Sequence, residues 1–153
     1  MTTAEKIDAI RRFPSQLEAL VTDLTPEELT TAYNAPEWTV AQNVHHLVDS
    51  HMNSYIRMKL MQTEDNPTLK PYDQDDWANL PDSQSADIRA SLAIIRGLHQ
   101  RWSVFLENVE DWSRTGYHPA NGPVTIASQL EYYVAHCEGH LKQIQAVLDK
   151  MPK

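Results

Sequence analysis

Histidines are the residues of this chain whose type and spacing could do chemistry. Three of the seven lie in the short stretch NVHHLVDSHMNSYIR, residues 43–57, and two more, His136 and His140, are four residues apart. On a helix, that spacing places both imidazoles on one face, one turn apart. Neutral imidazoles bind divalent metals, with each nitrogen about 2.1 Å from the ion. The pair therefore indicates a metal site, although a pair of this kind is weak evidence alone.

A third ligand is predicted in the helical segment that begins at Thr39. Its apolar positions form one stripe, and a line of polar residues adjoins that stripe at steps of three and four. The members of this line are Asn43, His46, Ser50, Asn53 and Arg57. A polar line beside a core stripe is costly unless it faces a cavity, a partner or water. His46 lies on it, and we expect it to complete a three-histidine site with His136 and His140.

Three other histidines and the single cysteine are expected to have structural roles. His45 faces away from the apolar stripe and should pair at the surface with Asp49. His51 and His99 replace aliphatic residues in apolar stripes, which favours hydrogen-bonded core histidines, although His51 could also support the metal site. Cys137 lies on the apolar stripe of its own helix, so a small buried residue is favoured over a nucleophile.

Four long amphipathic segments must position these residues. Apolar steps of three and four predict helices over 3–24, 39–62, 88–109 and 125–148. Capping boxes at Thr2, Thr25 and Thr39 predict helix starts, and the second of them opens a short helix from Pro26 to about Thr31. Pro14 predicts a kink or break near Phe13 in the first helix. The pattern predicts an all-α four-helix bundle with a long crossover loop, in a single domain spanning residues 1–153.

Two connections carry less periodicity. The first, residues 63–83, contains three prolines, and a loop of this length in a compact domain usually covers a site or crosses over the bundle. Both roles stay open for it. Its large apolar residues are expected to pack down: Leu69, Tyr72, Trp77 and Leu80. The second connection, residues 110–123, contains His118 beside a proline, and the pattern does not place that histidine.

Composition excludes several classes of function. The net charge is −8 and the calculated pI is near 5.2, with no block of Lys and Arg, so nucleic-acid binding is not expected. A single cysteine excludes an internal disulfide framework and suits a reducing compartment. Neither a signal peptide nor a transmembrane run is present, so we expect a cytoplasmic protein that does not bind membranes.

Three neutral histidines would leave coordination positions open on a metal, which is typical of catalytic sites. Such an ion can lower the pKa of a bound water, giving hydroxide for hydrolysis, or that of a bound thiol, giving thiolate. The geometry alone does not choose between these two reactions.

The segment WTVAQNVHHLVDSHMNSYIR, residues 38–57, resembles the DinB-like superfamily, in particular its YfiT or bacillithiol-transferase branch. The likeness continues through TEDNP, KPYD, Trp77 and LPDS, and it resumes at Tyr117-His118-Pro119 and YVAHCEGHL. This resemblance implies a four-helix bundle that holds nickel or zinc through His46, His136 and His140. It also implies a cytoplasmic location and a homodimer.

The resemblance favours a metal-dependent thiol S-transferase that joins a low-molecular-weight thiol, such as bacillithiol, to an electrophilic small molecule. The groups expected to orient the thiol are Asn43, Ser50, Asn53 and Arg57. The alternative is a metal-dependent hydrolase that uses metal-bound hydroxide, with Asp49 or Glu138 as the base. A third alternative is a non-catalytic bundle that binds a metal or ligand.

Overall fold

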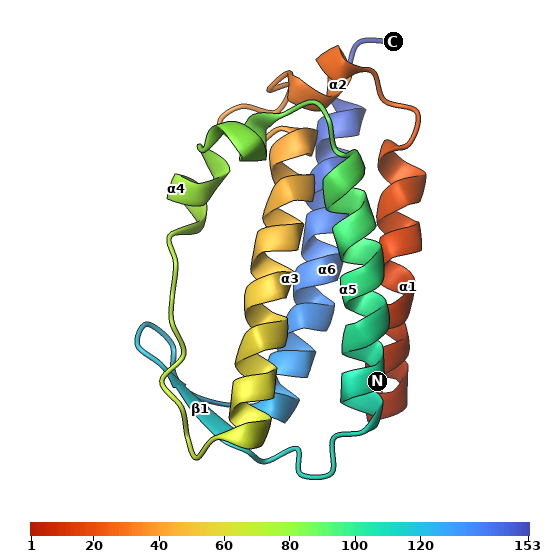
Figure 1. Ribbon diagram of the computed structural model, residues 1–153. Coiled ribbons are helices and arrows are strands. Elements are labelled where there is room, and N and C mark those ends of the chain that lie inside the picture. The colour runs from red at the N-terminus through yellow and green to blue at the C-terminus, as the bar shows by residue number, and fades with distance from the viewer.

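Four long helices lie side by side in the computed structural model, which describes residues 1–153 (Figure 1). They are α1 (Thr3–Val21), α3 (Val40–Thr63), α5 (Arg89–Glu107) and α6 (Ile126–Asp149). In Figure 1, α1 and α6 run upward, whereas α3 and α5 run downward. Both α1 and α3 pack against α5 and α6, so α1 and α3 lie diagonally opposite each other. The predicted four-helix bundle with a long crossover is confirmed.

Threonine caps set where several of the helices begin. The hydroxyls of Thr2, Thr39 and Thr125 each accept a hydrogen bond from the backbone N–H three residues on. Thr25 does the same for the short helix α2 (Pro26–Thr30). Each such cap stabilises its helix by about 1 kcal/mol, because it satisfies a backbone donor that the helix cannot. The capping boxes predicted at Thr2, Thr25 and Thr39 are confirmed.

The core lies between the four long helices, which bury their apolar faces against one another. Its largest fully buried side chains include Phe13, Leu47 and Trp102. None of the helices combines the length and the apolar character that a membrane span requires.

Pro14 lies inside α1 without ending it. Of the predicted kink or break near Phe13, the break was wrong, because α1 is continuous from Thr3 to Val21 and both residues are buried in the core, whereas the kink stays a prediction. A proline has no N–H, so the carbonyl of Ile10, four residues earlier, lacks its usual helical donor. The Nδ1 atom of His99 on α5 lies 2.6 Å from that carbonyl oxygen and replaces the missing donor. A side chain from another helix therefore compensates for the proline.

A two-stranded hairpin closes one end of the bundle, where a plain connection was expected. Its strands are β1 (Thr115–His118) and β2 (Gly122–Thr125), and they pair antiparallel. The hairpin was missed because each strand has only four residues and lacks a clear apolar alternation. Arg114, just before β1, donates to the carbonyls of Met61 and Glu64 at 2.8 Å each. It thereby satisfies carbonyl oxygens at the C-terminal end of α3, which have no backbone N–H donor within the helix.

The crossover after α3 is fixed to this hairpin. The Leu69 N–H donates to the Tyr117 carbonyl at 2.8 Å, and the Tyr117 N–H donates to the Pro67 carbonyl at 2.9 Å. Leu69 is buried as predicted, and a Cβ on Gly116 would lie only 3.0 Å from its Cδ1 atom. The glycine is therefore required for the close approach of crossover and hairpin.

The crossover then returns along the bundle through α4 (Gln74–Ala78) and the 3-10 turn η1 (Pro81–Gln84). Trp77 and Leu80 remain 37% and 50% exposed, so the prediction that they pack down was wrong. The reason is that α4 turns Ala78 toward the bundle, while Trp77 packs on the ring of Tyr72 with centroids 4.4 Å apart.

Candidate metal centre

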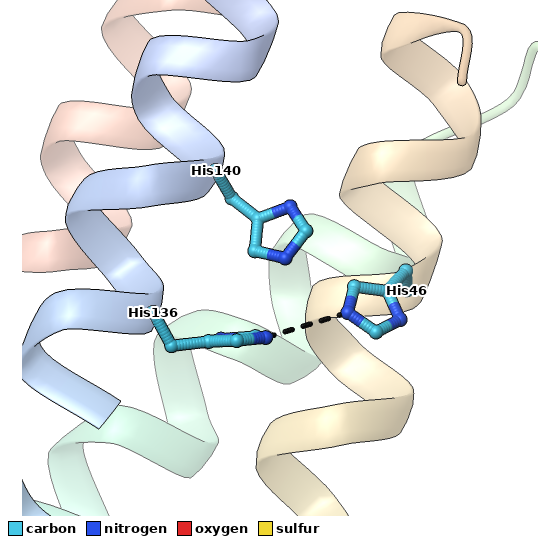
Figure 2. Close-up of side chains that lie close together, drawn as sticks. All are labelled: His46, His136 and His140. Carbon is cyan, nitrogen blue, oxygen red and sulfur yellow. Dashed lines mark hydrogen bonds between the residues drawn. The ribbon is translucent and has the colours of Figure 1, made fainter. Parts of the chain in front are cut away.

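The three histidines predicted as ligands meet across the contact between α3 and α6 (Figure 2). His46 comes from α3, and His136 and His140 come from successive turns of α6. One ring nitrogen from each lies within 4.8 Å of the others, and the Nε2 atoms of His46 and His136 are 3.4 Å apart. Two ligands at about 2.1 Å from a tetrahedral ion stand about 3.4 Å apart. The donor set therefore fits a divalent cation.

Burial keeps these imidazoles in the form that binds metal. Burial and the neighbouring His140 lower the pKa of His46 to about 3. Burial and the two neighbouring imidazoles lower the pKa of His136 to about 3, and burial lowers that of His140 to about 4. All three are therefore neutral at pH 7, as ligation requires. A cation also suits a buried place where several lone pairs converge.

Asn43 orients the His140 imidazole. Its Oδ1 atom lies 2.9 Å from the His140 Nδ1 atom, and its Nδ2 atom donates to the Thr39 carbonyl at 3.0 Å. Since the amide oxygen can only accept, Nδ1 of His140 carries the hydrogen and Nε2 keeps its lone pair. The structure thus places Asn43 beside a candidate metal ligand, and its expected contact with a thiol stays a prediction.

His51 and His99 are hydrogen-bonded core histidines, as predicted. The Nε2 atom of His51 also lies 3.2 Å from Nδ1 of His136, so the alternative role for His51 beside the metal site fits the structure as well. Trp38 covers the other side of the centre, with its ring centroid 4.8 Å from that of His46. Sequence reasoning missed Trp38, which precedes α3 and belongs to no helical pattern.

Two pockets meet at His136. One, of about 160 Å³, includes Ser50, Arg57 and His118 in its lining. The other, of about 400 Å³, includes Glu37, Trp38, Asp75 and His140. Both pockets are lined by His136, Gln74 and Tyr132. The crossover supplies Gln74 and Asp75, so it helps to cover the site, which is one of the two roles left open for it.

Arg57 is the cationic group of the smaller pocket. Its Nη2 atom donates to the Lys70 carbonyl, whereas its buried Nε atom has no hydrogen-bond partner. A guanidinium in the wall of a pocket suits a carboxylate or phosphate group on a ligand. Ser50 lines the same pocket, but Asn53 lines neither and donates instead to the Asp49 carbonyl at 2.7 Å.

The carboxylates suggested as bases lie outside both pockets. Asp49 is partly buried, and this burial, together with the smaller effect of the negative charge on Asp82, raises its pKa to about 6. Glu138 is exposed on α6. The carboxylates that line the larger of these two pockets are Glu37 and Asp75. They were missed because they belong to a loop and a five-residue helix, where no helical period signals a common face.

His45 and Cys137 are both buried, which agrees with the prediction for Cys137 but not with that for His45. His45 is only 7% exposed, and its ring nitrogens lie 2.7 Å from Ser91 Oγ and 2.9 Å from the Ser85 carbonyl. The predicted surface pair with Asp49 was therefore wrong, because the start of α5 and the segment before it cover this face of α3. Cys137 is buried as predicted, and burial raises the pKa of its thiol.

His118, which the sequence did not place, lies at the end of β1. Its Nδ1 atom accepts from the backbone N–H groups of Ala120 and Asn121 at 3.1 and 3.2 Å, within the hairpin turn. The imidazole also lines the smaller pocket. His118 therefore belongs to the wall of the candidate site rather than to the histidine cluster.

Comparisons with known proteins agree with this fold. The family model of the DinB superfamily matches residues 9–144. A protein of Oceanobacillus iheyensis named "Putative metal-dependent hydrolase" is 43% identical over 145 residues, covering 94% of this chain and 84% of the relative. A Bacillus mycoides protein with the same descriptive name is 41% identical over 147 residues, covering 95% of this chain and 84% of the relative.

A solved structure, YfiT from Bacillus subtilis, superimposes with a TM-score of 0.93 at 39% identity. The match covers 97% of this chain and 87% of YfiT, which is described as "a probable metal-dependent hydrolase with an unusual four-helix bundle topology". The family model spans most of the chain, and the relatives align over nearly all of it. This chain therefore belongs to the DinB superfamily.

Proposed function

We propose that the chain is a metal-dependent enzyme in which His46, His136 and His140 hold a divalent ion, zinc or nickel. We further propose that it is a thiol S-transferase, which joins a low-molecular-weight thiol such as bacillithiol to an electrophilic small molecule. The observation that carries this choice is the meeting of two pockets at His136. Transfer brings two organic reactants to one centre, whereas hydrolysis needs only one beside water.

The residues around the centre have distinct tasks in this reaction. A divalent ion, when bound, supplies Lewis acidity that lowers the pKa of a coordinated thiol or water. Arg57 would hold an anionic group of one reactant, since it lines the smaller pocket and carries a positive charge. Glu37 and Asp75 line the other pocket and are candidates to accept the proton that the nucleophile loses.

The second candidate is a metal-dependent hydrolase. It is favoured by the names of the relatives and by the two carboxylates that line the larger pocket with His136 and His140. A base in that pocket would have to be Glu37 or Asp75, because Asp49 and Glu138 line neither pocket.

Dependence on thiol separates the two reactions. The metal-loaded protein would be incubated with bacillithiol and a fluorogenic alkyl halide, and the thioether product identified by mass. A transferase consumes one thiol per product, and His140→Ala should abolish the rate above the uncatalysed background. Turnover of esters or amides without thiol would instead support the hydrolase.

The non-catalytic alternative is supported if the fully metal-loaded protein shows neither activity. The small-molecule substrate, the homodimer and the cytoplasmic location stay proposals drawn from the family resemblance. Light scattering during size-exclusion chromatography tests the dimer directly.

A further inference from the structure

A chain of buried imidazoles leads from the metal centre to the far side of the core. The His136 Nδ1 atom lies 3.2 Å from His51 Nε2, and His51 Nδ1 lies 2.6 Å from His99 Nε2. His99 Nδ1 lies 2.6 Å from the Ile10 carbonyl oxygen. His51 and His99 are both fully buried. Neither residue belongs to the proposed metal ligands, so the burial of two polar side chains in the core has no explanation in metal binding itself.

The carbonyl at the end of this chain determines where each hydrogen lies. A carbonyl oxygen can only accept, so His99 must carry its hydrogen on Nδ1. A neutral imidazole has one donor and one acceptor, and Nε2 of His99 must therefore accept from Nδ1 of His51. By the same rule, Nε2 of His51 accepts from Nδ1 of His136. The His136 Nε2 atom is then left with its lone pair, directed at the other two ligands.

The surroundings support neutral rings. No carboxylate is hydrogen-bonded to His51 or His99, and a buried charge without a partner costs several kcal/mol. Burial lowers the pKa of His99 to about 4. The ring of Phe13 packs against both imidazoles, with centroids 5.6 Å from His51 and 5.3 Å from His99. The rings are thereby held in place and kept from water.

We propose that His51 and His99 are positioning residues that hold His136 as its Nδ1–H tautomer, so that its Nε2 lone pair faces the metal. Pro14 has no N–H to donate to the Ile10 carbonyl, and His99 supplies the donor that this carbonyl lacks. The two histidines from α6 are thus oriented differently. The amide of Asn43 orients His140, whereas a hydrogen-bonded chain of His51, His99 and the Ile10 carbonyl, which we call the imidazole relay, orients His136.

The relay has a fixed direction. Because its last member is a carbonyl, which cannot take up or pass on a proton, the relay does not conduct protons away from the site. Its effect is to orient His136 and to increase the basicity of its free nitrogen, as partners of metal-binding histidines generally do.

This inference rests on the metal-binding part of the proposed function, but its first test needs neither metal nor substrate. Long-range ¹H–¹⁵N spectra of the metal-free protein, labelled with ¹⁵N-histidine, report the tautomer of each ring. We expect Nδ1–H for His51, His99 and His136. An Nε2–H tautomer for any of the three would overturn the proposal, whatever reaction the protein catalyses.

The second test breaks the relay at its distant end. In His99→Phe, His51 loses its acceptor, so the His136 ring should show a mixture of tautomers, and the Kd for zinc should rise about tenfold. The matched control is His45→Phe, which also replaces a buried imidazole whose nitrogens both have partners. It should leave the His136 tautomer and the zinc Kd unchanged. If His99→Phe folds and shows the same His136 tautomer and zinc Kd as His45→Phe, the proposal is refuted. If His99→Phe does not fold, the tautomers in the wild-type spectrum test the proposal on their own.

Discussion

Replacing Asn43 by alanine should weaken metal binding without touching a ligand. Asn43 is 1% exposed, and its Oδ1 atom is the hydrogen-bond acceptor for Nδ1 of His140, at 2.9 Å. In Asn43→Ala, that buried N–H either stays unsatisfied, which costs about 1–3 kcal/mol, or its hydrogen moves to Nε2. A hydrogen on Nε2 blocks the atom that must bind the metal. Both outcomes disfavour the metal-bound state.

The expected magnitude follows from the same contact. Loss of a partner that orients a metal-binding histidine typically lowers affinity 10- to 100-fold, which corresponds to about 1.4–2.8 kcal/mol. The zinc Kd would be measured by competition with a chromogenic chelator at pH 7. Asn43→Asp retains an acceptor at this position and should bind zinc more tightly than Asn43→Ala.

Asn53→Ala is the matched control. The amides of Asn43 and Asn53 each donate to the carbonyl four residues earlier on α3, so both alanine variants lose the same local bond. Only Asn43 also contacts a ligand, and Asn53→Ala should therefore keep the wild-type Kd. Equal affinities for Asn43→Ala and wild type, or equal losses in both alanine variants, would refute the assigned role of Asn43.

Three further predictions concern the ligands, the pocket and the response to pH. His140→Ala should lose its metal on dialysis, whereas His118→Ala should keep the wild-type ratio of metal to protein by elemental analysis. Arg57→Met should raise the KM for an anionic thiol at least tenfold with little change in kcat, and it should leave the KM for an uncharged thiol nearly unchanged. The folded-state pKa of His99 is about 4, below the 6.5 of the unfolded chain, so His99 contributes stability above pH 6.5 that is lost as pH falls toward 4. This loss amounts to about 3 kcal/mol for His99 alone, of which about 2 kcal/mol falls between pH 7 and pH 5. In urea unfolding of the metal-free protein, the fall in stability from pH 7 to pH 5 should therefore be about 2 kcal/mol smaller in His99→Phe than in wild type, because the other buried histidines lower the stability of both proteins alike.

The helices could be predicted because their signals are local. A threonine cap with a partner three residues later marks a helix start in any context, and α3 begins directly after Thr39 as that rule requires. The meeting of the three histidines could be predicted for a related reason, since helical spacing alone places His136 and His140 on one face, one turn apart. His46 could be predicted to join them because it lies on a line of polar residues, and such a line must face a cavity, a partner or water.

Features that depend on irregular segments could not be predicted in this way. A helical wheel shows that His45 points away from the main stripe of α3, but not that the start of α5 will cover it. Glu37 and Asp75 line the larger pocket because of where a loop and the short helix α4 lie against the bundle, which no local period encodes. The hairpin could not be predicted for the same reason. Its position depends on Gly116, which has no Cβ and lets Leu69 of the crossover approach β1.

Pro14 shows most clearly how a local rule can be sound and still mislead. The rule states that a proline removes a helical hydrogen bond, and from the sequence this indicated a kink or break in α1. The bond is indeed missing, but the freed Ile10 carbonyl accepts from His99, which is 89 residues away in the sequence. The cost within α1 is thereby offset by a contact that also fixes the direction of the imidazole relay. A variant such as Pro14→Ala restores the helical donor and makes α1 a better isolated helix. The Ile10 carbonyl would then accept from two donors, since it has two lone pairs, and its bond to His99 should weaken. If the relay acts as proposed, that substitution raises the helix propensity of α1 and lowers the affinity for zinc, two effects that a purely structural role for Pro14 would not combine.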